Sequence, residues 1–259
     1  MSLNPKISDW RGKRVWLLGA SSGIGAALAQ ALAEGGARVA LSARHAEAVE
    51  RMRRELPGAD HLAVSCDATQ PAQLEAACAS LSDAWGGIDV AIYLAGDYVP
   101  LRAADFTPAA VRKLCEVNYL GAVNFAYAVL PLLPQCGSGG LVLVSSVAGY
   151  RGLPKALGYG ASKAALSYFA EALFIDLQPR GIGVWVVHPG FVATRLTAQN
   201  DFSMPALITP ELAARCLIDG LAGGGFELHF PKRFTRFMKL LRLLPDCVYF
   251  RLMRRVAGD

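Results

Sequence analysis

Short apolar runs alternate with longer alanine-rich helical segments along this chain, and this alternation constrains the fold more than any other feature. The runs that predict strands are Arg14–Leu18, Arg38–Ser42, His61–Cys66, Val90–Leu94, Leu141–Ser145, Val184–Val187 and Glu227–Phe230. Helical patterns cover about 23–35, 46–55, 71–84, 108–133, 159–178 and 210–221. Repeated strand–helix–strand units imply right-handed crossovers. The sequence therefore predicts an α/β fold with one doubly wound, Rossmann-like parallel sheet.

Composition supports this fold and a reducing compartment. Apolar residues make up 53% of the 259 residues, which fits a parallel sheet covered on both faces. The six cysteines are scattered, as is typical of reduced thiols, and predict neither disulfides nor a zinc site. The first ten residues show no secretory signal. The charge-free stretch 15–33 contains glycines typical of a strand–turn–helix rather than a membrane span. We therefore expect a cytoplasmic protein.

A glycine-rich turn follows the first predicted strand directly. Glycine permits a tight turn and close approach of a pyrophosphate to the backbone, and the helix start adds free N–H groups and a positive dipole end. The spacing is G-x-x-x-G-x-G, which differs from the G-x-G-x-x-G of many dinucleotide folds. The residues that we expect to cradle phosphates are Gly19, Ser21, Ser22, Gly23, Ile24 and Gly25.

The same turn also spells G-x-S-x-G around Ser21, the pattern of the nucleophile elbow in α/β-hydrolases. A hydrolase would need a histidine later in the chain, and His188 or His229 could serve. The elbow normally follows several strands, whereas this turn follows the first strand, and a serine nucleophile leaves Gly25 unexplained. The hydrolase stays open as an alternative.

The end of the second predicted strand indicates which dinucleotide binds. An acid there would hold the ribose 2′-hydroxyl of NAD, whereas an arginine would accommodate the 2′-phosphate of NADP. The segment Leu41–Arg44 contains no acid, and Arg44 offers a planar fork to a phosphate. The sequence therefore favours NADP over NAD.

Tyr159 and Lys163 stand four residues apart and therefore share one face of a predicted helix. An ammonium near a phenol lowers the pKa of the phenol, and acid–base catalysis works best when that pKa approaches the ambient pH. Ser146 follows a predicted strand, at the sheet edge where parallel sheets bind ligands. Asn118, in an apolar helix, is by itself more typical of a satisfied core amide. The pair alone is a weak signal, and its setting strengthens it.

Taken together, these features resemble the short-chain dehydrogenase/reductase family over roughly residues 10 to 230. The matching positions are Gly19, Gly23, Gly25, Asp67, Ala95, Gly96, Asn118, Ser146, Tyr159, Lys163, Pro189, Gly190 and Thr194. The resemblance implies an oxidoreductase that transfers a hydride between NADP(H) and a carbonyl or secondary alcohol carbon. All of these positions except Asn118 and Ser146 are expected to bind the cofactor.

The resemblance also implies individual roles. Tyr159 would transfer the proton to or from the substrate oxygen, which Ser146 would hydrogen-bond. Lys163 would lower the pKa of the tyrosine and bind the nicotinamide ribose. Asn118 would hold a water for a proton relay. These four residues are intact, which argues against the other alternative, an inactive dinucleotide-binding paralogue.

Two further roles and two departures complete the resemblance. Asp67 would contact the adenine and Thr194 the carboxamide. Leu18 replaces the family's usual threonine before the first glycine, and Tyr93 and Leu94 replace two asparagines. Those asparagines brace the sheet near the cofactor, so we expect local repacking and no loss of chemistry.

The loops expected around the nicotinamide are Asp97–Leu101, Val147–Gly158 and Phe191–Pro210, and they are rich in large apolar residues. They predict an apolar, lipid-like or steroid-like ketone or alcohol as the small-molecule substrate. The same side chains could instead pack a lid against the domain, and both interpretations stay open.

The segment 231–259 has a different charge from the rest of the chain. It holds eight basic and two acidic residues, net +6, whereas residues 1–230 hold 18 basic and 19 acidic residues, net −1. Apolar residues at helical spacing lie mostly opposite the basic ones; they are Phe234, Phe237, Met238, Leu241 and Leu244. Such a helix can lie on an anionic membrane or cover the domain or a partner subunit.

We therefore expect a dinucleotide-binding and catalytic domain over 1–230 and a basic amphipathic extension over 231–259. The basic excess is confined to the extension and no nucleic-acid module is recognisable, so nucleic acid is not an expected partner. The resemblance implies a homo-oligomer, a dimer or tetramer formed through the helices that hold Asn118 and Tyr159.

Overall fold

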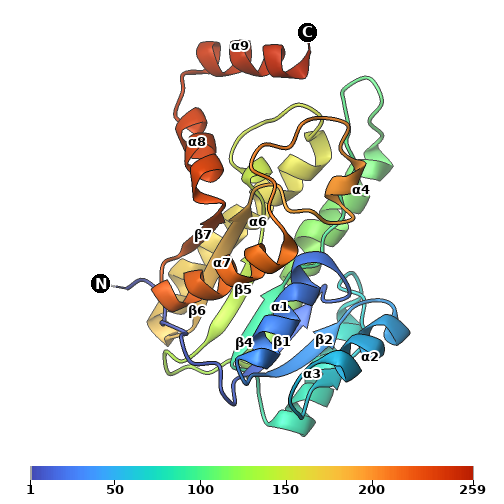
Figure 1. The fold of residues 1–259 in the computed structure, drawn as a ribbon, viewed down its shortest axis with the longest axis vertical. Coiled ribbons are helices and arrows are strands. Elements are labelled where there is room, and N and C mark those ends of the chain that lie inside the picture. Colours follow the sequence, from blue (N-terminus) through green and yellow to red (C-terminus); the bar gives the residue numbers. More distant parts are fainter. Residues whose placement is uncertain (1, 259) are drawn as a thin grey trace.

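The computed structural model describes residues 2–258 and contains one parallel sheet of seven strands, ordered β3-β2-β1-β4-β5-β6-β7. The strands are β1 (Arg14–Leu18), β2 (Arg38–Ser42), β3 (Leu62–Ala63), β4 (Val90–Tyr93), β5 (Gly140–Val144), β6 (Gly183–Pro189) and β7 (Glu227–Phe230). The predicted doubly wound, Rossmann-like fold is confirmed (Figure 1).

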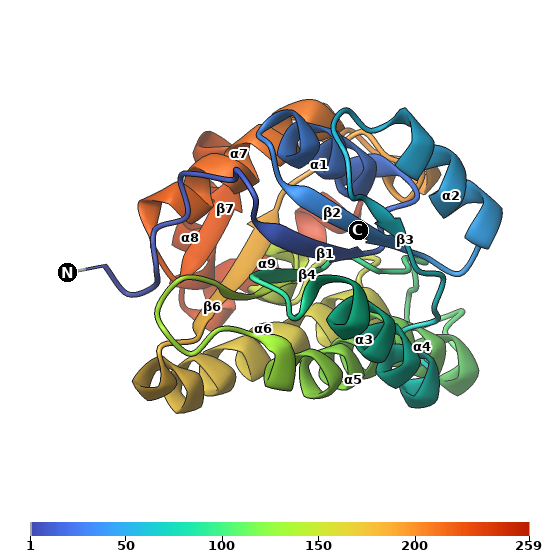
Figure 2. The ribbon, with the colours of Figure 1, turned by 90° about the horizontal axis from the view of Figure 1, so that it is seen from below.

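Helices cover both faces of the sheet. They are α1 (Gly23–Glu34), α2 (Ala46–Glu55), α3 (Pro71–Trp85), α4 (Pro108–Cys115), α5 (Gly121–Val129), α6 (Leu157–Leu177), α7 (Pro210–Gly223), α8 (Lys232–Arg242) and α9 (Asp246–Ala257). Figure 2 shows α1, α2 and α7 on one face and α3 to α6 on the other. Because strand side chains alternate, Val15 and Leu17 enter one core and Trp16 and Leu18 the other. The two cores explain the high apolar content.

The third strand is shorter than predicted. The sequence indicates His61–Cys66, whereas the regular strand covers Leu62–Ala63; beyond it the amides of Val64 and Cys66 still donate to the carbonyl oxygens of Leu41 and Ala43. At the start of the predicted strand, the His61 side chain takes the place of a backbone carbonyl as hydrogen-bond acceptor for β2: its Nδ1 accepts the Val39 amide proton at 3.1 Å. Strand β3 lies at the edge of the sheet, where such a replacement leaves the other ladders intact.

The long helix predicted over 108–133 is interrupted. A π-helical turn, Glu116–Leu120, separates α4 from α5. Tyr93 donates a hydrogen bond of 2.5 Å from its hydroxyl to the Val117 carbonyl oxygen in this turn. Tyr93 thus holds the π turn from strand β4. Single π turns within helices occur frequently at functional sites.

The extension forms two helices where one was predicted. Pro245 follows the end of α8 and directly precedes α9. The inner residues Met238, Leu241, Tyr249 and Met253 form a small core with Val147 of the domain. The extension thus packs on the domain, as one of the two interpretations predicts. Among residues 2–258, no helix is long and apolar enough to cross a bilayer.

Candidate active site

A cavity of about 420 Å³ opens at the carboxyl ends of the central strands. It is lined by every predicted cofactor-binding residue, namely Gly19, Ser21, Ser22, Gly23, Ile24, Gly25, Arg44, Asp67, Ala95, Gly96, Tyr159, Lys163, Pro189, Gly190 and Thr194. Ser146 lines it as well, and Asn118 does not. Residues scattered over most of the chain therefore meet in one place.

The glycine turn between β1 and α1 fits a pyrophosphate. Gly19 has φ +99°, and a Cβ there would lie 2.5 Å from the Ala95 amide nitrogen; a Cβ at Gly25 would collide with the Gly19 carbonyl oxygen. Only glycine allows this backbone packing. Ser22 makes no side-chain capping bond to α1, and the first turn holds no acidic residue. The positive end of this helix dipole therefore faces the cavity without neutralisation.

The opposite end of the cavity offers a cation. Arg44 is exposed and lines the cavity, and within residues 2–258 it takes part in no ion pair. The Ser65 hydroxyl donates to the backbone oxygens of Ala43 and Arg44, which holds this corner. Asp67 accepts two bonds of 2.9 Å from Thr69, one from the amide and one from the hydroxyl. An unpaired guanidinium at this position fits a phosphate group.

Tyr159 and Lys163 lie in the first two turns of α6, and both face the cavity. The Lys163 ammonium lies 5.9 Å from the centre of the Tyr159 ring and donates to the Val144 carbonyl oxygen at 2.9 Å. Burial lowers the pKa of Lys163 to about 8. Burial also raises the pKa of Tyr159, and a hydrogen bond with the Ser146 hydroxyl opposes this rise only in part.

The direction of the Tyr159 shift corrects one prediction. The spacing of Tyr159 and Lys163 predicts a tyrosine pKa below its usual value, whereas in this structure burial outweighs the distant ammonium. The phenol is therefore protonated at neutral pH. A buried phenol that holds its proton beside a cavity can donate it to an oxygen bound there.

Ser146 is held by the short turn that follows β5. Its Oγ accepts the Ala148 amide proton at 3.1 Å at the start of a 3-10 turn, Val147–Gly149. Gly149 packs against the backbone of Lys163, where a Cβ would lie 2.9 Å from the carbonyl carbon. The turn and α6 thus fix Ser146 relative to Tyr159. Tyr98 meets the Tyr159 ring edge-on, with the centroids 5.0 Å apart.

Asn118 lies behind the cavity and is fully buried. Its Oδ1 accepts the Asp97 amide proton at 2.7 Å, and its Nδ2 donates to the Asp97 carbonyl oxygen and to the Ser162 hydroxyl, both at 2.9 Å. The side chain therefore braces the segment after β4 against α6 as a satisfied amide, which its apolar surroundings predict. Its role in a water relay stays a prediction.

The predicted substrate loops both pack together and leave apolar groups exposed. Phe191 packs against Phe202 and Phe234, with centroid distances of 5.9 and 5.4 Å. Lys155 forms an ion pair of 2.5 Å with Asp201, which joins two of the loops. The exposed large residues here are Val99, Leu157, Phe202 and Leu207. The lid and the pocket interpretations therefore each describe part of these loops.

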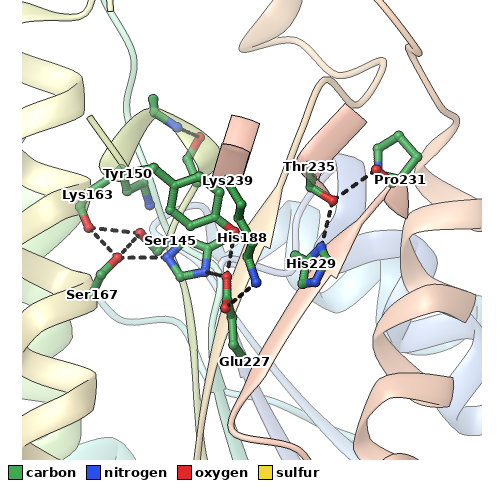
Figure 3. Close-up of polar contacts among 12 residues, drawn as sticks. Ser145, Tyr150, Lys163, Ser167, His188, Glu227, His229, Pro231, Thr235 and Lys239 are labelled. Atoms are coloured by element: carbon green, nitrogen blue, oxygen red, sulfur yellow. Dashed lines mark hydrogen bonds and ion pairs between the residues drawn. The ribbon is translucent and has the colours of Figure 1, made fainter. Parts of the chain in front are cut away.

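Sequence reasoning missed a second, buried polar cluster beside the cavity (Figure 3). The Ser167 hydroxyl contacts His188 Nε2 at 2.9 Å and donates to the Lys163 carbonyl oxygen, to which Ser145 also donates. Glu227 lies 3.0 Å from His188 Nδ1. We call Ser145, Tyr150, Ser167, His188, Glu227 and Lys239 the His188 cluster. A histidine at the end of an apolar strand was the available signal.

Glu227 has three donors within this cluster. The Lys239 ammonium lies 2.6 Å from one carboxylate oxygen, and the Tyr150 hydroxyl and His188 ring approach the other. These donors hold the pKa of Glu227 well below its usual range, although burial opposes them. Burial lowers the pKa of His188. The cluster therefore joins the extension, through Lys239, to the backbone of Lys163.

The two histidines that the hydrolase alternative proposes do not lie beside Ser21. His188 is committed to Ser167 and Glu227, and the Nδ1 of His229 lies 2.6 Å from the Thr235 hydroxyl. Neither ring lines the cavity that Ser21 lines. Neither of the two histidines considered for the hydrolase therefore lines the cavity as a general base for Ser21.

Comparison with known proteins agrees with the geometry. Residues 13–203 match the family model described as short chain dehydrogenase. An uncharacterized oxidoreductase of Myxococcus xanthus is 36% identical over 241 residues, which is 92% of this chain and 95% of that protein. Dehydrogenase/reductase SDR family member 7 of Homo sapiens is 34% identical over 74% of this chain, which spans only 62% of that protein.

A solved structure is similar over almost the whole chain. It is a short chain dehydrogenase from Burkholderia cenocepacia in complex with NADP, with a TM-score of 0.82 and 27% identity. The alignment covers 95% of this chain and 99% of the other.

Proposed function

This chain belongs to the short-chain dehydrogenase/reductase family of NAD(P)-dependent oxidoreductases, and from that premise we propose that it transfers a hydride between NADP(H) and an apolar ketone or secondary alcohol. One observation carries the proposal: Ser146, Tyr159 and Lys163 line the same cavity as the glycine turn. Acid–base groups and a dinucleotide cradle are therefore within reach of one bound pair of molecules.

The residues of the chain supply the proton chemistry. A bound nicotinamide would supply or accept the hydride. Tyr159 gives its phenolic proton to the substrate oxygen in the direction of reduction, and the raised pKa of the phenol keeps that proton available. Ser146 holds the same oxygen with its hydroxyl. Lys163 provides positive charge beside the phenolate that remains and binds the nicotinamide ribose.

The cofactor proposed is NADP, with NAD disfavoured. Arg44 supports this choice, because its guanidinium is free at the corner where a 2′-phosphate would lie and no acid precedes it on β2. The similar Burkholderia structure holds NADP. Within the same proposal, Asp67 contacts the adenine and Thr194 the carboxamide.

The substrate proposed is apolar, because large apolar side chains dominate the loops beside Tyr159. Two aromatic residues support an apolar substrate: Tyr98 contacts Tyr159, and Phe191 follows Gly190, which lines the cavity. We also propose a homo-oligomer through α5 and α6. Tyr127, Tyr168 and Ile175 on these helices are exposed.

Thermal melting with each cofactor and NADPH consumption with apolar ketones test the proposal. We expect a larger melting shift with NADP than with equal NAD, because ligand that binds only the folded state stabilises it by mass action. Arg44→Ala should weaken NADP binding about tenfold to a hundredfold, the loss of a charged hydrogen bond of about 1.5 to 3 kcal/mol.

The matched control is Arg51→Ala, an exposed arginine on α2 that does not line the cavity. It should bind NADP as the unchanged chain does. Equal shifts with NAD and NADP would overturn the choice of cofactor. A chain stabilised by neither, with no NADPH consumption, would overturn the proposed function itself.

A further inference from the structure

Helix α8 presents different residues on its two sides. Thr235, Met238 and Leu241 are buried against the domain. On the opposite side Phe237, Leu240 and Leu243 are 54%, 65% and 78% exposed. The small core described above therefore uses only the inner side of this helix, and a second apolar stripe remains on the outer side.

Helix α9 repeats the arrangement. Its buried residues are Tyr249 and Met253, whereas Val248, Phe250 and Val256 are exposed. Single exposed apolar residues are ordinary, but a group of large ones on adjoining helices marks a binding surface. We call the exposed residues of α8, α9 and their junction the outer face.

The outer face is also strongly basic. Eight of the chain's basic residues lie in 231–259, and among residues 2–258 only one of the eight, Lys239, forms an ion pair. Asp246, the acid at the start of α9, pairs with Arg151 of the domain. The exposed cations left over are Lys232, Arg233, Arg236, Arg242, Arg251, Arg254 and Arg255. Apolar and unpaired basic groups therefore share one face.

Helix α9, which carries part of the outer face, lies beside the proposed substrate loops and contacts them with its inner side. The Tyr249 hydroxyl donates to the Gly152 carbonyl oxygen at 2.7 Å, and the Arg102 guanidinium donates to the Ala257 carbonyl oxygen at 3.2 Å. These bonds hold α9 against two loops near Tyr159. Figure 1 shows α8 and α9 projecting from the sheet at the end where its strands carry the cavity, with α9 outermost.

Charge decides between the possible occupants of this face. A second copy docking symmetrically would place the same cations against themselves, and like charges across an interface are unfavourable. A nucleic acid would match the charge but leave the exposed apolar side chains in water. An anionic lipid bilayer satisfies both, because its phosphates meet the arginines while its acyl boundary receives the apolar residues.

We propose that the outer face of α8 and α9 docks this protein on the surface of an anionic lipid bilayer, with the substrate loops turned toward the lipid. Docking itself does not depend on the proposed function. Delivery of an apolar substrate from the lipid does depend on it, and NADPH consumption in the absence of lipid tests that function separately.

Co-sedimentation of the full chain with vesicles tests the docking. We expect binding to vesicles of phosphatidylcholine with phosphatidylglycerol, at least tenfold weaker binding to pure phosphatidylcholine, and release as salt screens the charges. The variant Arg233→Gln, Arg236→Gln, Arg251→Gln should bind the anionic vesicles on the order of a hundredfold more weakly, since each cation contributes about fivefold.

A matched variant controls for loss of charge as such. Arg51→Gln, Arg180→Gln, Arg215→Gln removes three exposed arginines from α2, the 3-10 turn after α6, and α7, and it should bind as the unchanged chain does. Equal weakening by both triple variants would overturn the proposal, and so would equal binding to both vesicle types or to neither. A change of oligomeric state in the first variant, without vesicle binding by the unchanged chain, would make this face a subunit interface and overturn it too.

A second measurement needs no change to the outer face. Cys247 is exposed at the start of α9, and Cys136 is the other exposed cysteine. In a Cys136→Ser chain, an environment-sensitive dye on Cys247 should shift to the blue when anionic vesicles are added. A dye that does not respond while the protein co-sediments would place the contact elsewhere and overturn the assignment to α9.

Discussion

Two groups of polar residues, the cavity residues and the His188 cluster, both draw on helix α6 and the end of β5. They differ in the surroundings of their polar atoms. Ser146, Tyr159 and Lys163 line the cavity; the neighbouring Ser145 borders it too, but its hydroxyl contacts Ser167 and the Lys163 carbonyl oxygen in the His188 cluster. Lys163 serves both, since its ammonium lies at the cavity and its carbonyl oxygen accepts from Ser145 and Ser167. Successive side chains after a strand alternate in direction, so adjacent serines reach opposite environments.

This difference separates chemistry from stability. In the His188 cluster, the hydroxyls and the Lys239 ammonium have hydrogen-bond partners within the protein, and His188 Nδ1 has a close contact of 3.0 Å with Glu227. Such networks stabilise a single arrangement. At the cavity, burial shifts the pKa values of Tyr159 and Lys163 without a carboxylate to offset it. Changes to the cavity residues Ser146, Tyr159 and Lys163 should therefore alter turnover, and changes in the His188 cluster should alter the free energy of unfolding.

The largest expected effect follows Tyr159→Phe, which keeps the ring and removes the acid. Turnover of a ketone with NADPH should fall about a thousandfold, within the usual contribution of a general acid. The melting temperature should change little, because the ring keeps its packing against Tyr98. Steady-state kinetics with thermal melting measure both.

Tyr168→Phe is the control for turnover: it removes a phenolic hydroxyl from the same helix outside the cavity and keeps the ring at the proposed subunit contact, so turnover should not change. If Tyr159→Phe kept turnover within about tenfold, a loss small for acid–base catalysis, the phenol could not be the proton donor.

Glu227→Gln should act on stability instead. The amide would meet the Lys239 ammonium, the Tyr150 hydroxyl and the His188 ring without the charge that holds all three. Because the carboxylate is partly exposed, we expect a loss of about 2 kcal/mol, less than for a fully buried pair. That loss lowers the melting temperature by about 4 to 8 °C in a chain of this size.

Glu50→Gln removes a comparable carboxylate from the surface pair with Arg53 and Arg54 on α2. Its cost should be clearly smaller than that of Glu227→Gln, because solvent screens exposed ion pairs. Equal costs for the two variants would show that the His188 cluster is no more than a surface ion pair. A thousandfold loss of turnover in Glu227→Gln would contradict the assignment of the His188 cluster to stability rather than to chemistry.

The two clusters were not equally predictable from the sequence. The proposed catalytic residues lie in local patterns, such as a serine after a strand and a tyrosine four residues before a lysine, so position along the chain predicts position at the sheet edge. The strands β1, β2 and β7 likewise match their predicted bounds residue for residue. Hydrophobic period and glycine spacing are local signals, and they survive without knowledge of the packing.

The His188 cluster and the π turn depend on contacts between distant segments. His188 meets Glu227 because β6 pairs with β7 in a register that local pattern does not determine. Asn118 interrupts the predicted long helix because Asp97 and Ser162 hold its amide from two other elements. The pKa of Tyr159 likewise depends on burial, which the spacing to Lys163 alone does not report.

The smallest expected effect is the alkaline pH dependence of the cavity cluster. The pKa of Lys163 is lowered from 10.5 to about 8, so its ammonium is present below about pH 8 and is lost above it. The pKa of Tyr159 is raised, so the phenol keeps its proton over the same range. Because kcat/KM reports groups of the free enzyme, its value for NADPH should fall up to tenfold per pH unit above about 8. Lys163→Arg stays charged throughout and should lose this decline even at reduced turnover. A decline that begins only above about pH 10 would reflect ionisation of the Tyr159 phenol, and the charge of Lys163 would then play no part in the reaction.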